Sequence, residues 1–305
     1  FDADGNEIPC DVDTWDTDGE SLIWVKVPTL ASTGDTITMK WGVGLKRMTT
    51  SADVWSDYAV VHHFSGAEDS VCTDSSGNGF KATLPPSVSE IQSAKIGNGV
   101  YKTSGTIVVD NYASLGLGGT FTASGWFYME QRTGYESFFC KKTNWDTGNG
   151  FQANLQNSDK QVFYAGSGNK NSTAVNLTSS VVGRWVYFVV AFEGPRARIY
   201  ENGKDYADQT LNSPGDNDLN LQIGGSNLKG FVDEIRIRKS MTWLAWGKND
   251  YATQTDANYC TYKFVSNPDV EYDEEPVVVL DGVPSSQAGS AVSIQVPYNV
   301  LWGGD

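Results

Sequence analysis

Apolar and polar residues alternate one for one in short stretches along most of this chain. The alternation is clearest from Leu22 to Pro28 and from Asp35 to Trp41, and turns rich in glycine, asparagine and aspartate follow. A period of two gives a strand one buried face and one solvated face. Such stretches recur about every 8 to 15 residues, which is typical of an antiparallel β sandwich. One helix is predicted, from Ser240 to Thr253.

The composition supports this all-β prediction and excludes several partners. The chain has 32 glycines, 10 Trp, 14 Tyr and 13 Phe, which suit turns and pleated surfaces. A net charge of −15 disfavours binding to nucleic acid and to anionic lipid. No apolar run approaches the roughly 20 residues that span a bilayer. We therefore expect no nucleic-acid partner and no membrane insertion within this segment.

The residues most often used in metal and redox sites are few and scattered. Cys10, Cys72, Cys140 and Cys260 form no CxxC pair, so zinc and thioredoxin-like sites are not indicated. Two disulfides and four free thiols both remain open. The two histidines, His62 and His63, are adjacent in a predicted strand and diverge, so they are expected to be packed strand residues. No GxSxG, GxGxxG or GxxxxGKS motif occurs.

An ordered set of motifs covers about 200 residues, from Asp53 to Tyr251. The set comprises VVHHFSG, DSSGNG, AKIGNGVY, FTASGWFY, GRWVYFVVAF, ARIYENGK and GFVDEIRIRKS. In order and spacing it resembles the laminin-G-like, concanavalin A-like jelly rolls of bacterial surface proteins. The resemblance implies an antiparallel two-sheet jelly-roll sandwich, flanked here by partial β domains.

The flanks suggest a division into four segments. Residues 1–50 resemble the C-terminal part of a bacterial domain of unknown function that commonly precedes such jelly rolls, and 51–266 form the jelly roll. The acidic stretch 267–276 is predicted to be a linker, and 277–305 resemble the start of an immunoglobulin-like or fibronectin-type repeat. We therefore expect the chain to begin and end within domains.

An oxygen-rich turn, Asp74 to Gly79, suggests a cation site. Calcium takes six to eight oxygen ligands in flexible geometry. In the jelly rolls that this chain resembles, the turn and the acid of a late strand hold one calcium ion, and the matching residues are Asp74, Asn78 and Asp233. The alternative is that Asp74 and Asn78 only satisfy the backbone of their own turn.

Strict alternation places Asp233 and its neighbour Glu234 on opposite faces of a strand. Glu234 would then share a face with Arg236 and Arg238, and we predict an ion-pair ladder there. Two carboxylates that diverge in this way do not form an acid/base pair.

The loop after residue 141 offers the clearest candidate ligand site. Trp145 is predicted to be exposed, with Asn144 and Tyr135 as polar or aromatic neighbours. Aromatic rings pack against the apolar C–H faces of sugars while polar groups bind the hydroxyls. The alternative is that Trp145 packs over the edge of the sandwich. Trp126 and Trp185 lie in strand motifs and are predicted to be core residues.

These observations favour a non-catalytic carbohydrate-binding or adhesion module of a large secreted or surface-attached bacterial protein. Its partner would be a polysaccharide or glycoprotein, and its location extracellular or at the cell surface. A structural spacer without a ligand is one alternative. A glycoside hydrolase is another, because Glu271, Asp273 and Glu275 have ExDxE spacing, but their Pro-flanked context indicates a linker.

Overall fold

The computed structural model describes most of the chain and gives a nearly all-β protein. The described residues are 1–16, 20–28, 36–40, 47–110, 115–144, 147–156, 160–166, 172–176, 180–241, 244–256, 259, 261–266, 274–279 and 291–296. They divide into unit 1, residues 1–56 with 248–305, and unit 2, residues 57–247. Within these ranges no helix is both long and apolar enough to cross a membrane.

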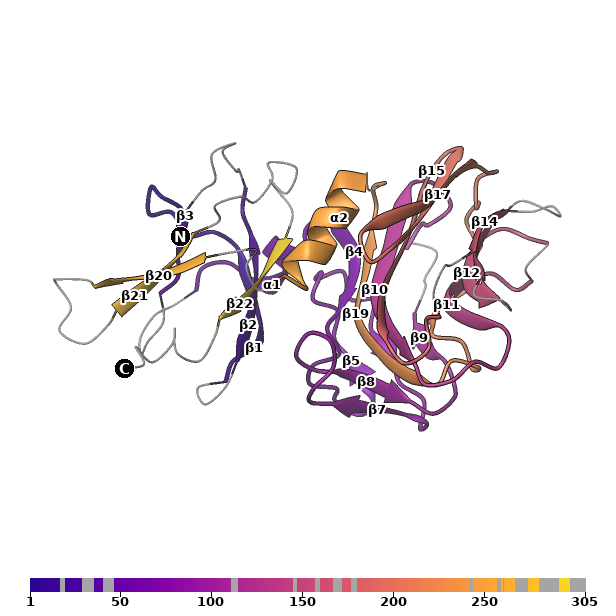
Figure 1. The fold of residues 1–305 in the computed structure, drawn as a ribbon, viewed down its shortest axis with the longest axis horizontal. Helices are drawn as coiled ribbons and strands as arrows, with labels where there is room; N and C mark the ends of the chain where they lie inside the picture. The colour runs from indigo at the N-terminus through magenta and orange to yellow at the C-terminus, as the bar shows by residue number, and fades with distance from the viewer. Residues whose placement is uncertain are drawn as a thin grey trace. The chain divides into compact units, whose positions relative to one another are not determined.

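Unit 2 consists of two eight-stranded sheets whose named strands pair antiparallel (Figure 1). The first sheet has the order β17-β16-β15-β10-β19-β8-β7, and β4 also pairs with β19. Its strands are β4 (Tyr58–His62), β7 (Val88–Ile91), β8 (Gly99–Lys102), β10 (Phe121–Met129), β15 (Trp185–Glu193), β16 (Arg196–Glu201), β17 (Lys204–Thr210) and β19 (Gly230–Arg238).

The second sheet has the order β14-β13-β12-β11-β18-β9-β6-β5. Its strands are β5 (Val71–Cys72), β6 (Ala82–Thr83), β9 (Ile107–Val109), β11 (Glu136–Lys141), β12 (Phe151–Gln156), β13 (Lys160–Ala165), β14 (Ser172–Asn176) and β18 (Leu221–Ile223). Two antiparallel sheets around one core confirm the predicted jelly-roll sandwich.

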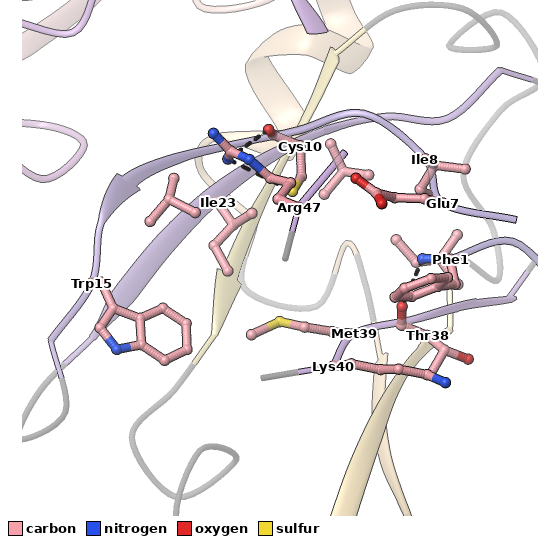
Figure 2. Close-up of a pocket in the computed structure, with 13 residues that line it drawn as sticks. Phe1, Glu7, Ile8, Cys10, Trp15, Ile23, Thr38, Met39, Lys40 and Arg47 are labelled. Carbon is pink, nitrogen blue, oxygen red and sulfur yellow. Dashed lines mark hydrogen bonds between the residues drawn. The ribbon is translucent and has the colours of Figure 1, made fainter. Parts of the chain in front are cut away.

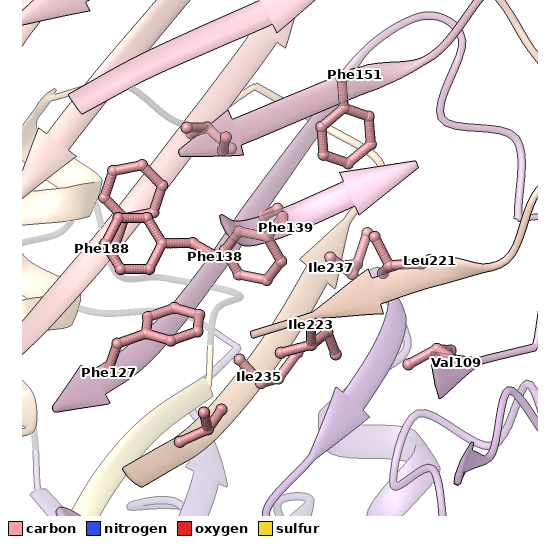
Figure 3. Close-up of a cluster of buried hydrophobic side chains, with 14 of the residues drawn as sticks. Val109, Phe127, Phe138, Phe139, Phe151, Phe188, Leu221, Ile223, Ile235 and Ile237 are labelled. Atoms are coloured by element: carbon pink, nitrogen blue, oxygen red, sulfur yellow. The ribbon is translucent and has the colours of Figure 1, made fainter. Parts of the chain in front are cut away.

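Side chains from both sheets fill one apolar core (Figure 3). Phe138 of β11 lies 4.8 Å from Phe127 of β10 and 4.3 Å from Phe188 of β15, measured between ring centroids. All three side chains are fully buried. Their burial removes large apolar areas from water and contributes about 1.5–3 kcal/mol per side chain. The core therefore fixes which face of each strand points outward.

Unit 1 is built from segments near both ends of the chain. One sheet contains β1 (Cys10–Thr14), β2 (Ser21–Lys26) and β22 (Ala291–Val296), and the other contains β20 (Thr261–Ser266), β21 (Glu274–Val279) and β3 (Thr36–Thr38). Ser21 of β2 pairs with Val296 of β22. The sequence analysis assigned residues 274–276 to a linker, whereas here they begin β21, because β21 pairs with β3. Residues 267–273 and 297–305 lie outside the described part.

The two helices in the described part of the chain are short. Helix α1 runs from Ser51 to Val54. Helix α2 runs from Leu244 to Thr253 and passes from unit 2 into unit 1 along the chain. It confirms the predicted helix for these residues. Cys10, Cys72 and Cys140 are free thiols, and Cys260 lies outside the described residues.

Candidate functional site

Four aromatic side chains lie on adjacent strands of the first sheet of unit 2. They are Tyr101 of β8, Phe231 of β19, Tyr128 of β10 and Trp185 of β15. Each is a direct cross-strand partner of the next, because Tyr101 pairs with Phe231, Phe231 with Tyr128, and Tyr128 with Trp185. We call these four residues the aromatic patch.

The patch lies on the face of the sheet that points away from the sandwich core. The chain neighbours of its residues, Val100, Phe127, Val186 and Val232, are buried in that core. Successive side chains of a strand point to opposite faces, so the four aromatic residues face outward. Each of them is only partly buried. The prediction that Trp185 is a core residue is therefore wrong.

The patch is compact. The ring centroids of Phe231, Tyr128 and Trp185 form a triangle with sides of 5.5, 5.8 and 6.0 Å. Tyr101 lies 4.9 Å from Phe231. Tyr128 meets its two neighbours edge to face, with interplanar angles of 75° and 67°, an arrangement that the ring quadrupoles favour. The rings thus support one another and are held in fixed orientations.

Gly230 lets the strands that carry the patch approach closely. Its φ is +142°, and a Cβ at this position would lie 1.9 Å from the carbonyl oxygen of Tyr128. A side chain is therefore incompatible with the observed backbone. The glycine places Phe231 beside Tyr128.

Polar groups border the patch. The Glu130 Oε2 atom accepts a hydrogen bond of 3.2 Å from the Tyr101 hydroxyl and lies 3.1 Å from the Lys229 ammonium. The hydrogen bond that the Lys229 ammonium makes with Glu130, together with the charge of Glu130, raises the pKa of Lys229 above its ordinary value. The ammonium of Lys95 lies 4.9 Å from the ring centroid of Trp126, two residues before Tyr128 on β10. Partly exposed aromatic rings beside such donors and acceptors can bind sugar rings.

The turn predicted to hold calcium is stabilised by its own hydrogen bonds. Asp74 Oδ1 accepts from the backbone N–H groups of Val61 and Ser76, at 2.9 and 3.0 Å. Asp74 Oδ2 accepts from the Ser76 hydroxyl at 2.7 Å and from the Phe80 N–H at 3.1 Å. The amide nitrogen of Asn78 donates to the carbonyl oxygens of Tyr58 and Ala59.

Asp233, the third predicted calcium ligand, holds a different turn. Its Oδ2 atom accepts from the backbone N–H groups of Lys95 and Ile96, at 3.0 and 2.7 Å. The carboxylate of Asp74 thus faces four hydrogen-bond donors and that of Asp233 faces two, whereas a cation needs oxygen lone pairs directed at it. The bonds of Asp74 and Asn78 agree with the alternative, in which these residues satisfy the backbone around their own turn. A calcium site at Asp74, Asn78 and Asp233 stays a prediction.

Two of the three predicted sugar-binding residues, Tyr135 and Asn144, lie apart. Tyr135, which is 58% exposed, directly precedes β11, and the exposed Asn144 follows it. The six residues of β11 span about 20 Å at 3.3 Å per residue, so the two side chains lie at opposite ends of the strand. Trp145 lies outside the described residues, and its role stays a prediction.

A second group of polar residues is buried beside β19. Glu234 Oε1 lies 2.7 Å from His63 Nδ1, and Glu234 Oε2 lies 2.6 Å from Arg236 Nη2. Burial raises the pKa of Glu234, but the charges of His63 and Arg236 outweigh it and hold the pKa below its ordinary value. The predicted Glu234–Arg236 pair is confirmed, whereas Arg238 pairs with Asp57 at 2.6 Å. Glu271 and Asp273, the core of the hydrolase alternative, lie outside the described residues.

Unit 1 contains a cavity of about 240 Å³ (Figure 2). Its apolar lining includes Ile23, Val25 and Ile37. One carboxylate, that of Glu7, lines it and accepts hydrogen bonds from the backbone N–H groups of Met48 and Thr49. The Thr49 bond is the largest cause of the lowered pKa of Glu7. The carboxylate of Glu7 thus binds and fixes the backbone of Met48 and Thr49.

Comparison with known families agrees with the architecture of unit 2. Two antiparallel sheets around an apolar core define a jelly-roll sandwich. Residues 101–244 match the family model of the concanavalin A-like lectin/glucanases superfamily, in agreement with the two-sheet sandwich of unit 2. Residues 1–77 match a domain of unknown function, DUF2341. Both matches confirm the resemblances found in the sequence. No curated protein sequence matches the chain significantly.

Several solved structures share this fold. The binding domain of Paraclostridial Mosquitocidal Protein 1 is 15% identical with a TM-score of 0.54, covering 80% of this chain and 68% of that one. Domain 4 of AbnA, a GH43 extracellular arabinanase from Geobacillus stearothermophilus in complex with arabinotriose, is 16% identical with a TM-score of 0.50, covering 63% and 97%. The botulinum neurotoxin serotype G binding domain is 13% identical with a TM-score of 0.52, covering 67% and 53%. At these identities the likeness shows the fold alone.

The sequence analysis missed the aromatic patch. Alternation along β10 places Trp126 and Tyr128 on one face, a signal that was present in the sequence. The patch, however, depends on the register of four strands from distant parts of the chain. No single motif encodes that register.

Proposed function

We propose that unit 2 is a non-catalytic carbohydrate-binding module of a secreted or surface-attached protein, with the aromatic patch as its contact surface. The observation that carries the proposal is the outward-facing cluster of Tyr101, Phe231, Tyr128 and Trp185 on a rigid sheet. The lectin/glucanase superfamily match supports it, as does the likeness in fold to domain 4 of AbnA, whose structure is a complex with arabinotriose.

The binding mechanism follows from the chemistry of the patch. The C–H faces of a sugar would pack against the rings, and this contact removes apolar area from water. The carboxylate of Glu130 would accept hydrogen bonds from sugar hydroxyls, and the ammonium groups of Lys229 and Lys95 would donate them. Since the rings already contact one another, binding costs little side-chain entropy.

The test is polysaccharide affinity electrophoresis of the full chain and of two variants, Trp185→Ala and Tyr135→Ala. Tyr135 is an exposed aromatic residue outside the patch and serves as the matched control. We expect a glycan to retard the wild type and the Tyr135 variant, and the Trp185 variant to bind about tenfold more weakly or worse. Circular dichroism checks that each variant is folded.

Two results would overturn the proposal. Retardation of the folded Trp185→Ala variant equal to that of the wild type would remove the patch from the site. Lack of retardation by any glycan in a broad panel would favour a protein partner or a structural role, because aromatic clusters also occur at protein interfaces.

A further inference from the structure

The orientation and size of the aromatic patch restrict the form of glycan that it can bind. Resting on the proposed function, we infer that the patch binds a short segment of a single, soluble, neutral glycan chain, and does not bind the flat surface of a crystalline polysaccharide. Three observations lead to this inference.

The first observation is the tilt of the rings. The planes of Tyr128 and Phe231 differ by 75°, those of Tyr128 and Trp185 by 67°, and those of Trp185 and Phe231 by 43°. A crystalline surface is a plane, so it stacks well only on rings that are coplanar. No two of these three rings meet that condition. A single chain rotates about its glycosidic bonds and presents each sugar at its own angle.

The second observation is the size of the patch. The ring centroid of Phe231 lies 4.9 Å from that of Tyr101 and 6.0 Å from that of Trp185. The centroids of Tyr101 and Trp185, the two outer rings, are therefore at most about 11 Å apart. The patch is smaller than the width of four strands suggests, because the Trp185 and Phe231 rings approach to 6.0 Å although β10 lies between their strands. A surface of this extent covers one or two sugar rings. Longer chains would gain no further aromatic contact.

The third observation concerns charge. The chain carries a net charge of −15, which repels polyanionic glycans over distances up to the screening length. Beside the patch, Glu130 and Lys229 form an ion pair with an oxygen–nitrogen distance of 3.1 Å. That pair offers hydrogen-bonding groups to hydroxyls with little net charge, and the charge of the Lys95 ammonium is offset by the nearby carboxylate of Asp233. A neutral sugar chain fits these conditions better than a uronic-acid polymer.

The experiment compares soluble and insoluble forms of the same polymers with the full chain. Hydroxyethylcellulose, mixed-linkage β-glucan, arabinoxylan and galactomannan serve as soluble neutral probes, and polygalacturonate serves as an acidic one. Microcrystalline cellulose and chitin are used in depletion assays. Calorimetry with oligosaccharides of one to six sugars measures the dependence on length for the best soluble probe.

We expect binding to at least one soluble neutral polymer, a constant affinity beyond two sugars, and no depletion by crystalline polymers. The Phe231→Leu variant should lose about tenfold in affinity, since leucine keeps the apolar contact but removes the ring. Depletion by crystalline cellulose or chitin that the Trp185→Ala variant abolishes would overturn the inference and leave the proposed function standing. An affinity that rises steadily up to six sugars, or a preference for polygalacturonate, would likewise overturn the inference and leave the proposed function standing. Lack of binding to every probe would overturn both.

Discussion

Lys102 gives the folded state of unit 2 a distinctive dependence on pH. Its side chain is fully buried on β8, next to Tyr101 of the patch. The amine donates hydrogen bonds to the carbonyl oxygens of Gly225 and Leu228. Burial lowers the pKa of Lys102 from 10.5 to about 8. A neutral amine still has two N–H groups, which are enough for the two carbonyls, so the folded state keeps these bonds when Lys102 loses its proton.

The size and sign of the effect follow from linkage. Between about pH 8 and the unfolded pKa of 10.5, the unfolded chain binds more protons than the folded chain, so stability rises with pH. Each unit of pKa difference is worth about 1.36 kcal/mol. From pH 7 to pH 9.5 the free energy of unfolding should therefore gain at most about 2 kcal/mol from this lysine.

Urea unfolding of the wild type and of the Lys102→Met variant at pH 7, 8.5 and 9.5 measures this gain. The thiols of Cys72 and Cys140 act in the opposite direction at high pH, because burial raises their pKa values, that of Cys72 to about 12. Since both proteins contain these thiols, the difference between the two pH profiles isolates Lys102. Parallel profiles for wild type and variant would refute the reasoning.

Two further substitutions test the turn and the core. Asp74→Ala removes the acceptor of four hydrogen bonds and should lower the free energy of unfolding by roughly 2–4 kcal/mol. Because those bonds occupy both oxygens, EDTA should leave the Tm of the wild type unchanged, and a lower Tm with EDTA would show a bound cation. Phe138→Ala should cost about 3–5 kcal/mol in urea unfolding; a cost below about 1 kcal/mol would contradict its packing between Phe127 and Phe188.

The sequence predicted the sandwich because strand signals are local. Alternation and turn residues mark a strand without knowledge of its neighbours, and the two-sheet fold agrees with the prediction. The pairing of Ser21 with Val296 could not be predicted in this way. The residues around Ser21 do not indicate that Val296 is its partner, because the same alternation allows pairing with many other strands.

The candidate site was less predictable for two physical reasons. Trp185 lies in an apolar stretch, so the sequence does not show which of its residues face the core. In the structure Val186 faces the core, and Trp185 therefore faces outward. Glu234 lies at a bulge in β19, with φ of +51° and a shift of register opposite Ser124 and Trp126. A bulge interrupts alternation, so the faces of Asp233 and Glu234 do not follow from counting residues.

The division of unit 1 between both ends of the chain has a consequence for biosynthesis. Strand β2 leaves the ribosome long before its partner β22, since Ser21 and Val296 are about 275 residues apart, a delay of roughly 15–55 s at ordinary rates of translation. All residues of unit 2 are made in that interval, and once it folds, Tyr58 near its start pairs with Arg238 near its end. That pairing shortens the effective length of chain between the N-terminal and C-terminal parts of unit 1, whose strands must come together. Folding of the jelly roll would thus lower the entropy cost of bringing the two parts of unit 1 together.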